Sequence, residues 1–276
     1  MATARNAASK EQVLVEKNGP VTTVIINRPE VRNCVDTPTG RKLVDAFLAF
    51  EQDRDAAVAV FWGAGGAFCA GGDLKALSES NGKDWMEDFA FRENGNGELP
   101  QGPLGPSRLQ LSKPVIAAVA GPAVAGGMEL ALWCDIRVME EDAYFGVYCR
   151  RWGVPLIDGG TVRLPRIVGM GRALDIILTG RQVMADEALR IGMCERVVPR
   201  GQSRQAAEAL AHEIARFPRE CMLSDRNSVH RAWGKPTREA MREEYWYGQP
   251  CLKNEGVAGA TRFKNGKGRH GDYENI

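Results

Sequence analysis

Short apolar runs alternate with amphipathic, helix-like stretches along most of this chain. The runs Val13–Glu16 and Val21–Ile26 flank the pair Asn18-Gly19, a spacing typical of a β-hairpin. The tripeptide Asp36-Thr37-Pro38 predicts a helix start, because a capping residue precedes a proline in the first turn. Apolar residues then continue at helical spacing as far as Leu48. The chain therefore opens with a hairpin followed by a helix.

The next part repeats one pattern. The apolar run Val58–Trp62 leads to a Gly-rich turn at 70–77, and Val115–Ala120 leads to a similar turn at 125–132. Each turn runs directly into a helix-like pattern. Further short strands are expected at Ile136–Met139 and at 196–198. Strands that alternate with helices predict a layered α/β domain.

Other segments are organised differently. Residues 78–107 are rich in Gly, Asn, Pro and charge, and predict either a lid beside a site, with a helix inside it, or a surface insertion. The stretch 161–191 is helical in pieces. Helices are expected beyond Pro199 at 203–216, 221–232, 237–252 and 254–263. We expect a flexible arm at 1–10, a core domain at 11–199, and a helical region at 200–276 that mediates assembly.

Composition narrows the classes of function. The chain has 276 residues, a formal net charge of +1 and no basic run, which disfavours nucleic acid as the main partner. Its seven cysteines are scattered and never spaced as CxxC, which argues against a disulfide framework or zinc site and favours a reducing compartment. The three histidines lie in the last third, away from the Gly-rich turns. With no apolar run typical of a signal or membrane span, a cytoplasmic location is expected.

The two Gly-rich turns carry the candidate chemistry. Glycine allows close approach of a ligand to the backbone, and the first N–H groups of a helix have no internal acceptor. Two such turns facing each other would direct two N–H donors at one developing negative oxygen. The alternative is that these glycines only permit close packing of helix against strand.

With these motifs in place, the sequence resembles the crotonase, or enoyl-CoA hydratase/isomerase, superfamily over roughly residues 11 to 265. Each matching motif is weak alone, but together and in order they are specific. They are Ile26-Asn27-Arg28-Pro29, Gly66-Ala67-Phe68-Cys69-Ala70-Gly71-Gly72-Asp73-Leu74, Lys113-Pro114-Val115-Ile116-Ala117-Ala118-Val119, Glu129-Leu130-Ala131, Cys134-Asp135-Ile136-Arg137, Leu178-Thr179-Gly180 and Ala185-Asp186-Glu187-Ala188-Leu189.

The resemblance implies a spiral of repeated ββα units with a helical C-terminal region that builds trimers, often paired into hexamers. It also implies an acyl-CoA substrate and no metal or redox cofactor. By motif position, the oxyanion-binding amides are those of Gly72 and Gly126. The internal repeat would instead pair Gly72 with Gly127, but Glu129 fixes the register in favour of Gly126.

The acid and base groups depart from the family pattern. Glu129 matches the first catalytic glutamate of the hydratases, although a first-turn glutamate also complements a helix dipole. The position of the second glutamate falls on Cys149, and a thiol is no simple substitute for a carboxyl group. This departure puts efficient hydration in doubt. Asp158, which precedes Gly159-Gly160, either compensates for the missing group or serves only as a turn or cap.

The CoA half of the site is assigned by the same resemblance. The backbone at Cys69 and Ala70 is expected to meet the adenine, and Arg28 to lie near the phosphates. Lys264 or Lys267 would add charge from the C-terminal region. The cofactor-binding motif also includes Asp73 and Leu74, although Asp73 is more typical of a helix start. Tyr148 and Arg151 are expected to line the acyl pocket.

These observations favour an enoyl-CoA hydratase-like lyase that forms a thioester enolate, with Glu129 as the proton carrier. One alternative is isomerisation, decarboxylation or other chemistry that needs a single carboxylate. An alternative of another class is a CoA-binding protein with little catalysis.

Overall fold

A computed structural model describes residues 11–83, 85–86, 89–91, 101–273 and 276. A larger sheet of six strands forms its centre, in the order β1-β2-β3-β4-β6-β9. Its strands are β1 (Val13–Asn18), β2 (Val21–Ile26), β3 (Val58–Gly63), β4 (Val115–Val119), β6 (Ile136–Glu140) and β9 (Arg196–Val198). Only β1 runs antiparallel to its neighbour, as the hairpin at Asn18-Gly19 requires.

A second, smaller sheet has three strands in the order β5-β7-β8. They are β5 (Pro122–Val124), β7 (Tyr144–Gly146) and β8 (Gln182–Met184). The sequence pattern did not reveal them, because three residues are too few to establish an alternating period. Successive units place one strand in the larger sheet, the next in the smaller sheet, and then a helix. Thus β4 and β5 precede α3 (Gly126–Trp133), and β6 and β7 precede α4 (Gly160–Val168).

The first helix begins where the capping signal predicted. The Oδ1 atom of Asp36 accepts a hydrogen bond from the Thr39 N–H at 2.8 Å and caps α1 (Thr37–Gln52). At the other end, the buried ammonium group of Lys113 donates to the carbonyl groups of Phe50 and Asp53 at 2.8 and 2.6 Å. The charged lysine therefore satisfies carbonyl groups at the C-terminus of the helix.

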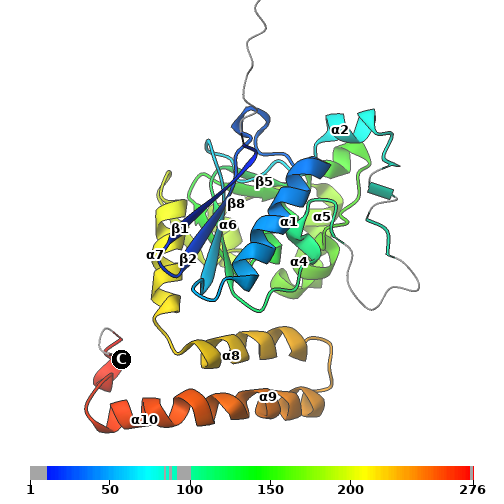
Figure 1. Ribbon diagram of the computed structural model, residues 1–276. Helices are drawn as coiled ribbons and strands as arrows, with labels where there is room; N and C mark the ends of the chain where they lie inside the picture. The colour runs from blue at the N-terminus through cyan, green and yellow to red at the C-terminus, as the bar shows by residue number, and fades with distance from the viewer. Residues whose placement is uncertain (1–10, 84, 87–88, 92–100, 274–275) are drawn as a thin grey trace, which may run out of the picture.

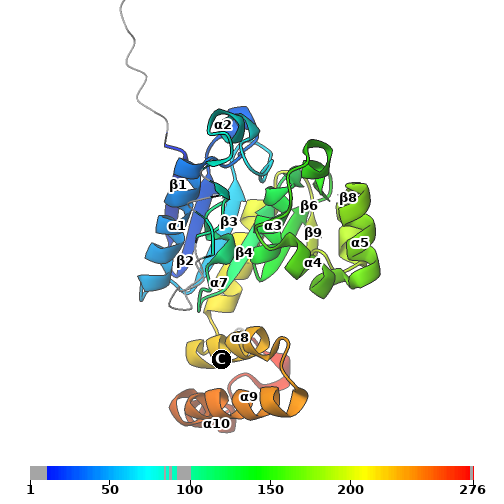
Figure 2. The ribbon, with the colours of Figure 1, turned by 90° about the vertical axis from the view of Figure 1, so that its right-hand side faces the viewer.

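The larger sheet is covered on both faces. Alternate residues of β3 point in opposite directions, so Phe61 packs toward α1 while Val60 packs toward α7 (Ser203–Ala215). Phe61 makes edge-to-face contacts with Phe47 and Phe68, with ring centroids 5.2 and 5.3 Å apart. Figure 2 shows the layered core and the helices that flank it. The buried aromatic cluster fixes the strands that carry the Gly-rich turns.

The remaining helices complete the core and form a separate layer. The core helices are α2 (Leu74–Glu79), α5 (Met170–Thr179) and α6 (Ala185–Arg190), and the 3₁₀ turns are Pro29–Val31, Pro106–Arg108, Tyr148–Trp152 and Arg269–Gly271. The C-terminal elements are α8 (Arg219–Ala232), α9 (Thr237–Cys251), a π-helical turn (Leu252–Gly256) and α10 (Val257–Lys264). In both ribbon views α8 lies between the core and α9 (Figures 1 and 2).

Several polar contacts tie the C-terminal layer to the core, and Asp135 makes two of them. Asp135 accepts a hydrogen bond from Arg226 at 3.0 Å and contacts His230 at 2.8 Å, and both partners lie on α8.

Large apolar side chains on α9, including Tyr245 and Trp246, stay exposed. The expected flexible arm at 1–10 and much of the proposed lid lie outside the described residues. Within the described ranges, no helix combines the length and the apolar character that a membrane span needs.

Candidate active site

The two Gly-rich turns lie in contact with each other. An isolated bridge pairs Cys69 with Ala123 of β5, which brings the first turn beside the second. Gly71 has a φ of +93°, and a Cβ atom there would lie 2.9 Å from the Gly126 nitrogen. Only glycine tolerates both this conformation and this approach. Gly72 and Gly126 line one cavity of about 330 Å³.

The amide groups of these two glycines have no acceptor within the described part of the chain. The backbone on either side of Gly72 is hydrogen-bonded to Val35: the Val35 N–H donates to Gly71 O, and the Asp73 N–H donates to Val35 O. Gly126 is the first residue of α3, where helix N–H groups have no internal partner. Both amides are therefore available to a ligand in the cavity. Ala125, just before Gly126, has a φ of 52° and a ψ of −124°, which is a strained conformation for a residue with a Cβ atom.

Apolar side chains cover the turns. A Cβ atom on Gly72 would lie 2.3 Å from the Trp85 ring, and one on Gly126 would lie 2.4 Å from Leu104 Cδ1. The other apolar or aromatic side chains that line the cavity are Val31, Ala70, Leu74, Val124, Ala125, Tyr148, Trp152, Val154, Pro155 and Ile157. Such a lining lowers the local dielectric and strengthens electrostatic interactions with the amides.

Glu129 lies in the first turn of α3 and lines the same cavity. Its side chain is buried, with the residue 2% exposed. The Oε1 atom accepts hydrogen bonds from the N–H groups of Asp158 and Gly160 at 2.9 and 2.8 Å. Burial and the neighbouring charge of Asp158 raise the pKa of Glu129 to about 8, even though these two hydrogen bonds lower it. The group is therefore mostly protonated at neutral pH.

Asp158 is the second carboxyl group of the cavity and is 1% exposed. Its Oδ1 atom accepts a hydrogen bond from the Leu104 N–H at 3.1 Å and a short one from the Ser107 hydroxyl. Its Oδ2 atom is buried and has no hydrogen-bond partner among the residues that the structure describes. Burial raises the pKa of Asp158, and the hydrogen bonds from Ser107 and Leu104 oppose that rise. Asp158 does not cap the helix that follows it, because α4 begins at Gly160 with no side-chain cap.

An arginine that the sequence did not reveal supports this pair of carboxyl groups. The guanidinium group of Arg163, on α4, donates to Asp158 O at 2.9 Å and to Ser107 O at 2.7 Å. Its positive charge lowers the pKa of Glu129 and of Asp158. Arg163 and Ser107 are not part of any motif in the sequence, and only the fold brings them behind the cavity.

Cys149 is the residue at which the resemblance expects the second glutamate. It lines the cavity on the 3₁₀ turn Tyr148–Trp152. Burial and the charge of Glu129 raise the pKa of its thiol, which is therefore neutral. Tyr148 and Arg151 also line the cavity, and the Arg151 guanidinium stacks 4.7 Å from the centre of the Tyr148 ring.

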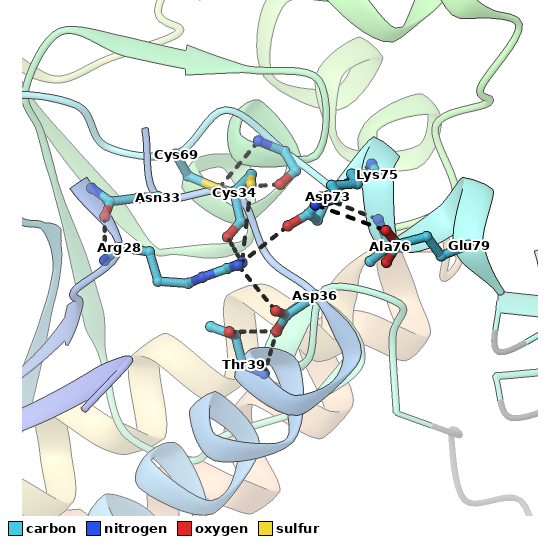
Figure 3. Close-up of polar contacts among 11 residues, drawn as sticks. Arg28, Asn33, Cys34, Asp36, Thr39, Cys69, Asp73, Lys75, Ala76 and Glu79 are labelled. Carbon is cyan, nitrogen blue, oxygen red and sulfur yellow. Dashed lines mark hydrogen bonds and ion pairs between the residues drawn. The ribbon is translucent and has the colours of Figure 1, made fainter. Parts of the chain in front are cut away.

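The guanidinium group of Arg28 contacts three other described residues of the protein (Figure 3). Its guanidinium group donates to Cys34 O at 2.6 Å and pairs with Asp36 and Asp73 at 3.1 and 3.2 Å. Asp73 also caps α2, since its Oδ1 atom accepts hydrogen bonds from the N–H groups at positions 75 and 76, which confirms it as a helix-start residue. Arg28 thus joins the helix starts of α1 and α2, and it is Arg32 rather than Arg28 that lines the cavity.

The other residues assigned to CoA lie at different depths. Ala70 and Leu74 line the cavity, whereas Cys69 is fully buried behind it and accepts a hydrogen bond from the Gly71 N–H at 3.3 Å. Lys264 is the last residue of α10. Figure 1 shows α10 on the side of α8 that faces away from the core. The described residues contain no group of three or more His, Cys, Asp or Glu side chains placed to hold a metal ion.

Comparisons with known proteins give the family. A family model described as enoyl-CoA hydratase/isomerase matches residues 16–246. The chain is 38% identical over 214 residues to the enoyl-CoA hydratase EchA19 of Mycobacterium tuberculosis, a match that covers 75% of this chain and 76% of the relative. It is 36% identical over 206 residues to the carnitinyl-CoA dehydratase of Salmonella typhimurium, covering 74% of each chain.

A solved structure supports the same conclusion. The crystal structure of the enoyl-CoA hydratase EchA1 of Mycobacterium marinum matches with a TM-score of 0.83 and 31% identity, covering 93% of this chain and 96% of that one. The predicted crotonase-like α/β fold with its C-terminal helices is thereby confirmed. The chain belongs to the enoyl-CoA hydratase/isomerase family of the crotonase superfamily.

Proposed function

We propose that this protein is a hydratase-like lyase that adds water to, or removes it from, an acyl-CoA thioester through an enolate. One observation carries the proposal. Two buried carboxyl groups, Glu129 and Asp158, line the same cavity as two unpaired backbone amides. The family membership supports an enoyl-CoA substrate, and the relatives include proteins named hydratase and dehydratase.

The amides of Gly72 and Gly126 would bind the thioester oxygen. Negative charge develops on this oxygen as the enolate forms, so donors that are fixed in place stabilise the transition state more than the substrate. The loss of one such donor typically costs about 3–4 kcal/mol of transition-state stabilisation. The side chains of Trp85 and Leu104 pack against the two turns, and their apolar character strengthens the interaction of the N–H groups with a developing charge.

The two carboxyl groups would divide the proton transfers. In hydration, the Asp158 carboxylate takes a proton from water as the water oxygen attacks the β-carbon. Electrons move onto the thioester oxygen, and Glu129, which is protonated at neutral pH, then protonates the α-carbon. A proton passing from Asp158 back to Glu129 restores the starting state, so all atoms and charges balance. Asp158 would thus take over the task of the glutamate that Cys149 replaces.

The neutral thiol at Cys149 favours a second candidate. If Asp158 takes no part in the reaction, Glu129 is left as the single acid and base, which suffices for isomerisation or decarboxylation. A CoA-binding protein with little catalysis is the outcome expected if neither carboxyl group matters. The rest of the assignment is common to these candidates: no separate cofactor, a CoA moiety near Ala70 and Leu74, and trimers or hexamers built by 200–276.

Incubation with crotonyl-CoA in ¹⁸O-labelled water tests the proposal. Labelled 3-hydroxybutyryl-CoA is the expected product, and both Glu129→Gln and Asp158→Asn are expected to lower kcat/KM by about 10²-fold or more. Glu140→Gln is the matched control, because Glu140 is also buried and bonded to a serine but does not line the cavity. Turnover of 3-enoyl or malonyl-type thioesters without labelled product would exclude hydration.

A further inference from the structure

A buried serine lies directly behind the second carboxyl group. Ser107 is fully buried, and its hydroxyl group donates a short hydrogen bond to Asp158 Oδ1. We propose that Ser107 is the positioning residue of Asp158: it holds Oδ1 against the protein and leaves Oδ2 for the reacting water. This inference rests on the proposed function, because it assigns a role to Ser107 through the base of that reaction.

The geometry around the pair is unusually constrained. A Cβ atom on Gly102 would lie 2.0 Å from Ser107 Oγ and 2.7 Å from Asp158 Oδ1, so only a glycine fits against the hydrogen bond. The Leu104 N–H donates to the same carboxylate oxygen at 3.1 Å. Oδ1 therefore has two donors and tight packing, whereas Oδ2 is buried and has no partner in the described part of the chain. One oxygen of the carboxyl group is thus fixed by the protein, and the other remains to accept a hydrogen bond from the reacting water.

Two arginines hold the serine segment and the aspartate segment together. Arg163 bridges Ser107 O and Asp158 O at 2.7 and 2.9 Å. Arg108, next to the serine, donates to Phe89 O at 2.7 Å and to Ile157 O at 3.4 Å. The two segments are thus cross-linked on both sides of the Ser107–Asp158 hydrogen bond. A hydrogen bond held in this way orients a side chain rather than merely filling space.

A second serine–carboxylate pair in the same chain shows what a structural role looks like. Ser203 Oγ donates to Glu140 Oε1 at 2.7 Å, and both residues are buried. That pair lies at the start of α7, and the same carboxylate oxygen also accepts the Ser203 N–H at 3.4 Å. Ser107 lies in a turn of only three residues, Pro106–Arg108, and has no helix to anchor. The buried hydroxyl group of Ser107 therefore does not serve to start a helix, and we assign it the role of orienting the Asp158 carboxyl group.

Charged groups on three elements face Asp158 and shift the pKa of its carboxyl group. Glu129 approaches from α3, Arg163 from α4, and Arg108 from the turn that contains Ser107. The hydrogen bond from Ser107 lowers the pKa of Asp158, as do both arginines. Removal of the hydroxyl group therefore raises that pKa. Because the base must be ionised, the acidic limb of the rate profile should move to higher pH.

The test compares Ser107→Ala with Ser203→Ala across pH, using hydration of an enoyl-CoA. Ser107→Ala is expected to lower kcat about tenfold or more with KM within about twofold, and to shift the acidic limb upward. Ser107→Cys, a weaker donor, should lie between the wild type and the alanine variant. Ser203→Ala should leave kcat and the limb unchanged. Equal effects of the two alanine variants would overturn the inference.

Two further measurements keep the result decisive. In an Asp158→Asn background, Ser107→Ala should have almost no additional effect, because the serine acts through the aspartate; additive losses would overturn the inference. If the wild type hydrates no enoyl-CoA, the proposed function fails, and ¹³C NMR titration of the Asp158 carboxyl group becomes the readout. A higher pKa of Asp158 in Ser107→Ala but not in Ser203→Ala would then support the positioning role, and no change would refute it.

Discussion

Replacement of Glu129 by glutamine is expected to stabilise the protein at alkaline pH while it removes activity. Glutamine has nearly the same shape, and its carbonyl oxygen still accepts the N–H groups of Asp158 and Gly160. What it lacks is a charge. The carboxyl group of Glu129 must ionise inside a buried cavity beside another carboxyl group, and the amide escapes this penalty.

The magnitude follows from the pKa. The pKa of Glu129 is about 8, compared with an ordinary value of 4.5. Each tenfold change in proton affinity corresponds to about 1.4 kcal/mol, so ionisation destabilises the fold by at most roughly 5 kcal/mol. Because the folded-state pKa is raised, the stabilising effect of the bound proton is complete below pH 4.5 and is lost as pH rises through about 8.

Urea unfolding of the wild type and of Glu129→Gln at about pH 5 and pH 9 measures this effect. The variant should gain about 2–5 kcal/mol relative to the wild type between these two conditions, while kcat/KM falls by about 10²-fold or more. A stability difference that is the same at both pH values would refute the raised pKa. It would also remove the reason for assigning Glu129 as the acid.

Three other changes test the turns and the thiol. Gly71→Ala would place a carbon 2.9 Å from the Gly126 nitrogen, and should lower kcat/KM by about 10²-fold through loss of one oxyanion donor; unchanged kinetics would exclude that amide. Ala125→Gly should add about 1 kcal/mol to the free energy of unfolding, because glycine adopts the observed positive φ without strain; a loss in urea unfolding would contradict this. Cys149 should react with iodoacetamide at least ~10-fold more slowly than the exposed Cys221, as followed by mass spectrometry, because its thiol is buried and neutral; equal rates would indicate an accessible thiolate.

The fold was predictable where signals are local. Asp36 and the proline after it marked the start of α1, and Asn18-Gly19 marked the hairpin, because caps and tight turns depend on neighbouring residues. The strands β5, β7 and β8 could not be found in this way. Each has three residues, and each forms only because a partner far along the chain pairs with it.

The same distinction applies to the site. The sequence motifs located Gly72, Gly126 and Glu129, and the structure brings all three to one cavity. Ser107 lies 51 residues before Asp158, and no spacing rule connects the two. The partners of Arg28 were hidden for the same reason, since a guanidinium group suits phosphate and carboxylate equally well. An arginine at position 28 predicts an anionic partner, but the residue type does not say whether that partner is a phosphate or a carboxylate.

The charges in the cavity give a physical reason for a cysteine, rather than a glutamate, at position 149. The cavity already holds two carboxyl groups. Burial raises the pKa of Glu129 to about 8 and also raises the pKa of Asp158, although the donors from Ser107 and Leu104 favour the ionised form of Asp158. A third carboxyl group at position 149 would line the same cavity close to Glu129, in a medium of low dielectric where repulsion between close charges reaches several kcal/mol. This repulsion would raise its pKa and disfavour the ionised form that a base needs. A neutral thiol at Cys149 adds no further charge to this pair, which agrees with the proposal that Asp158 serves as the second carboxylate.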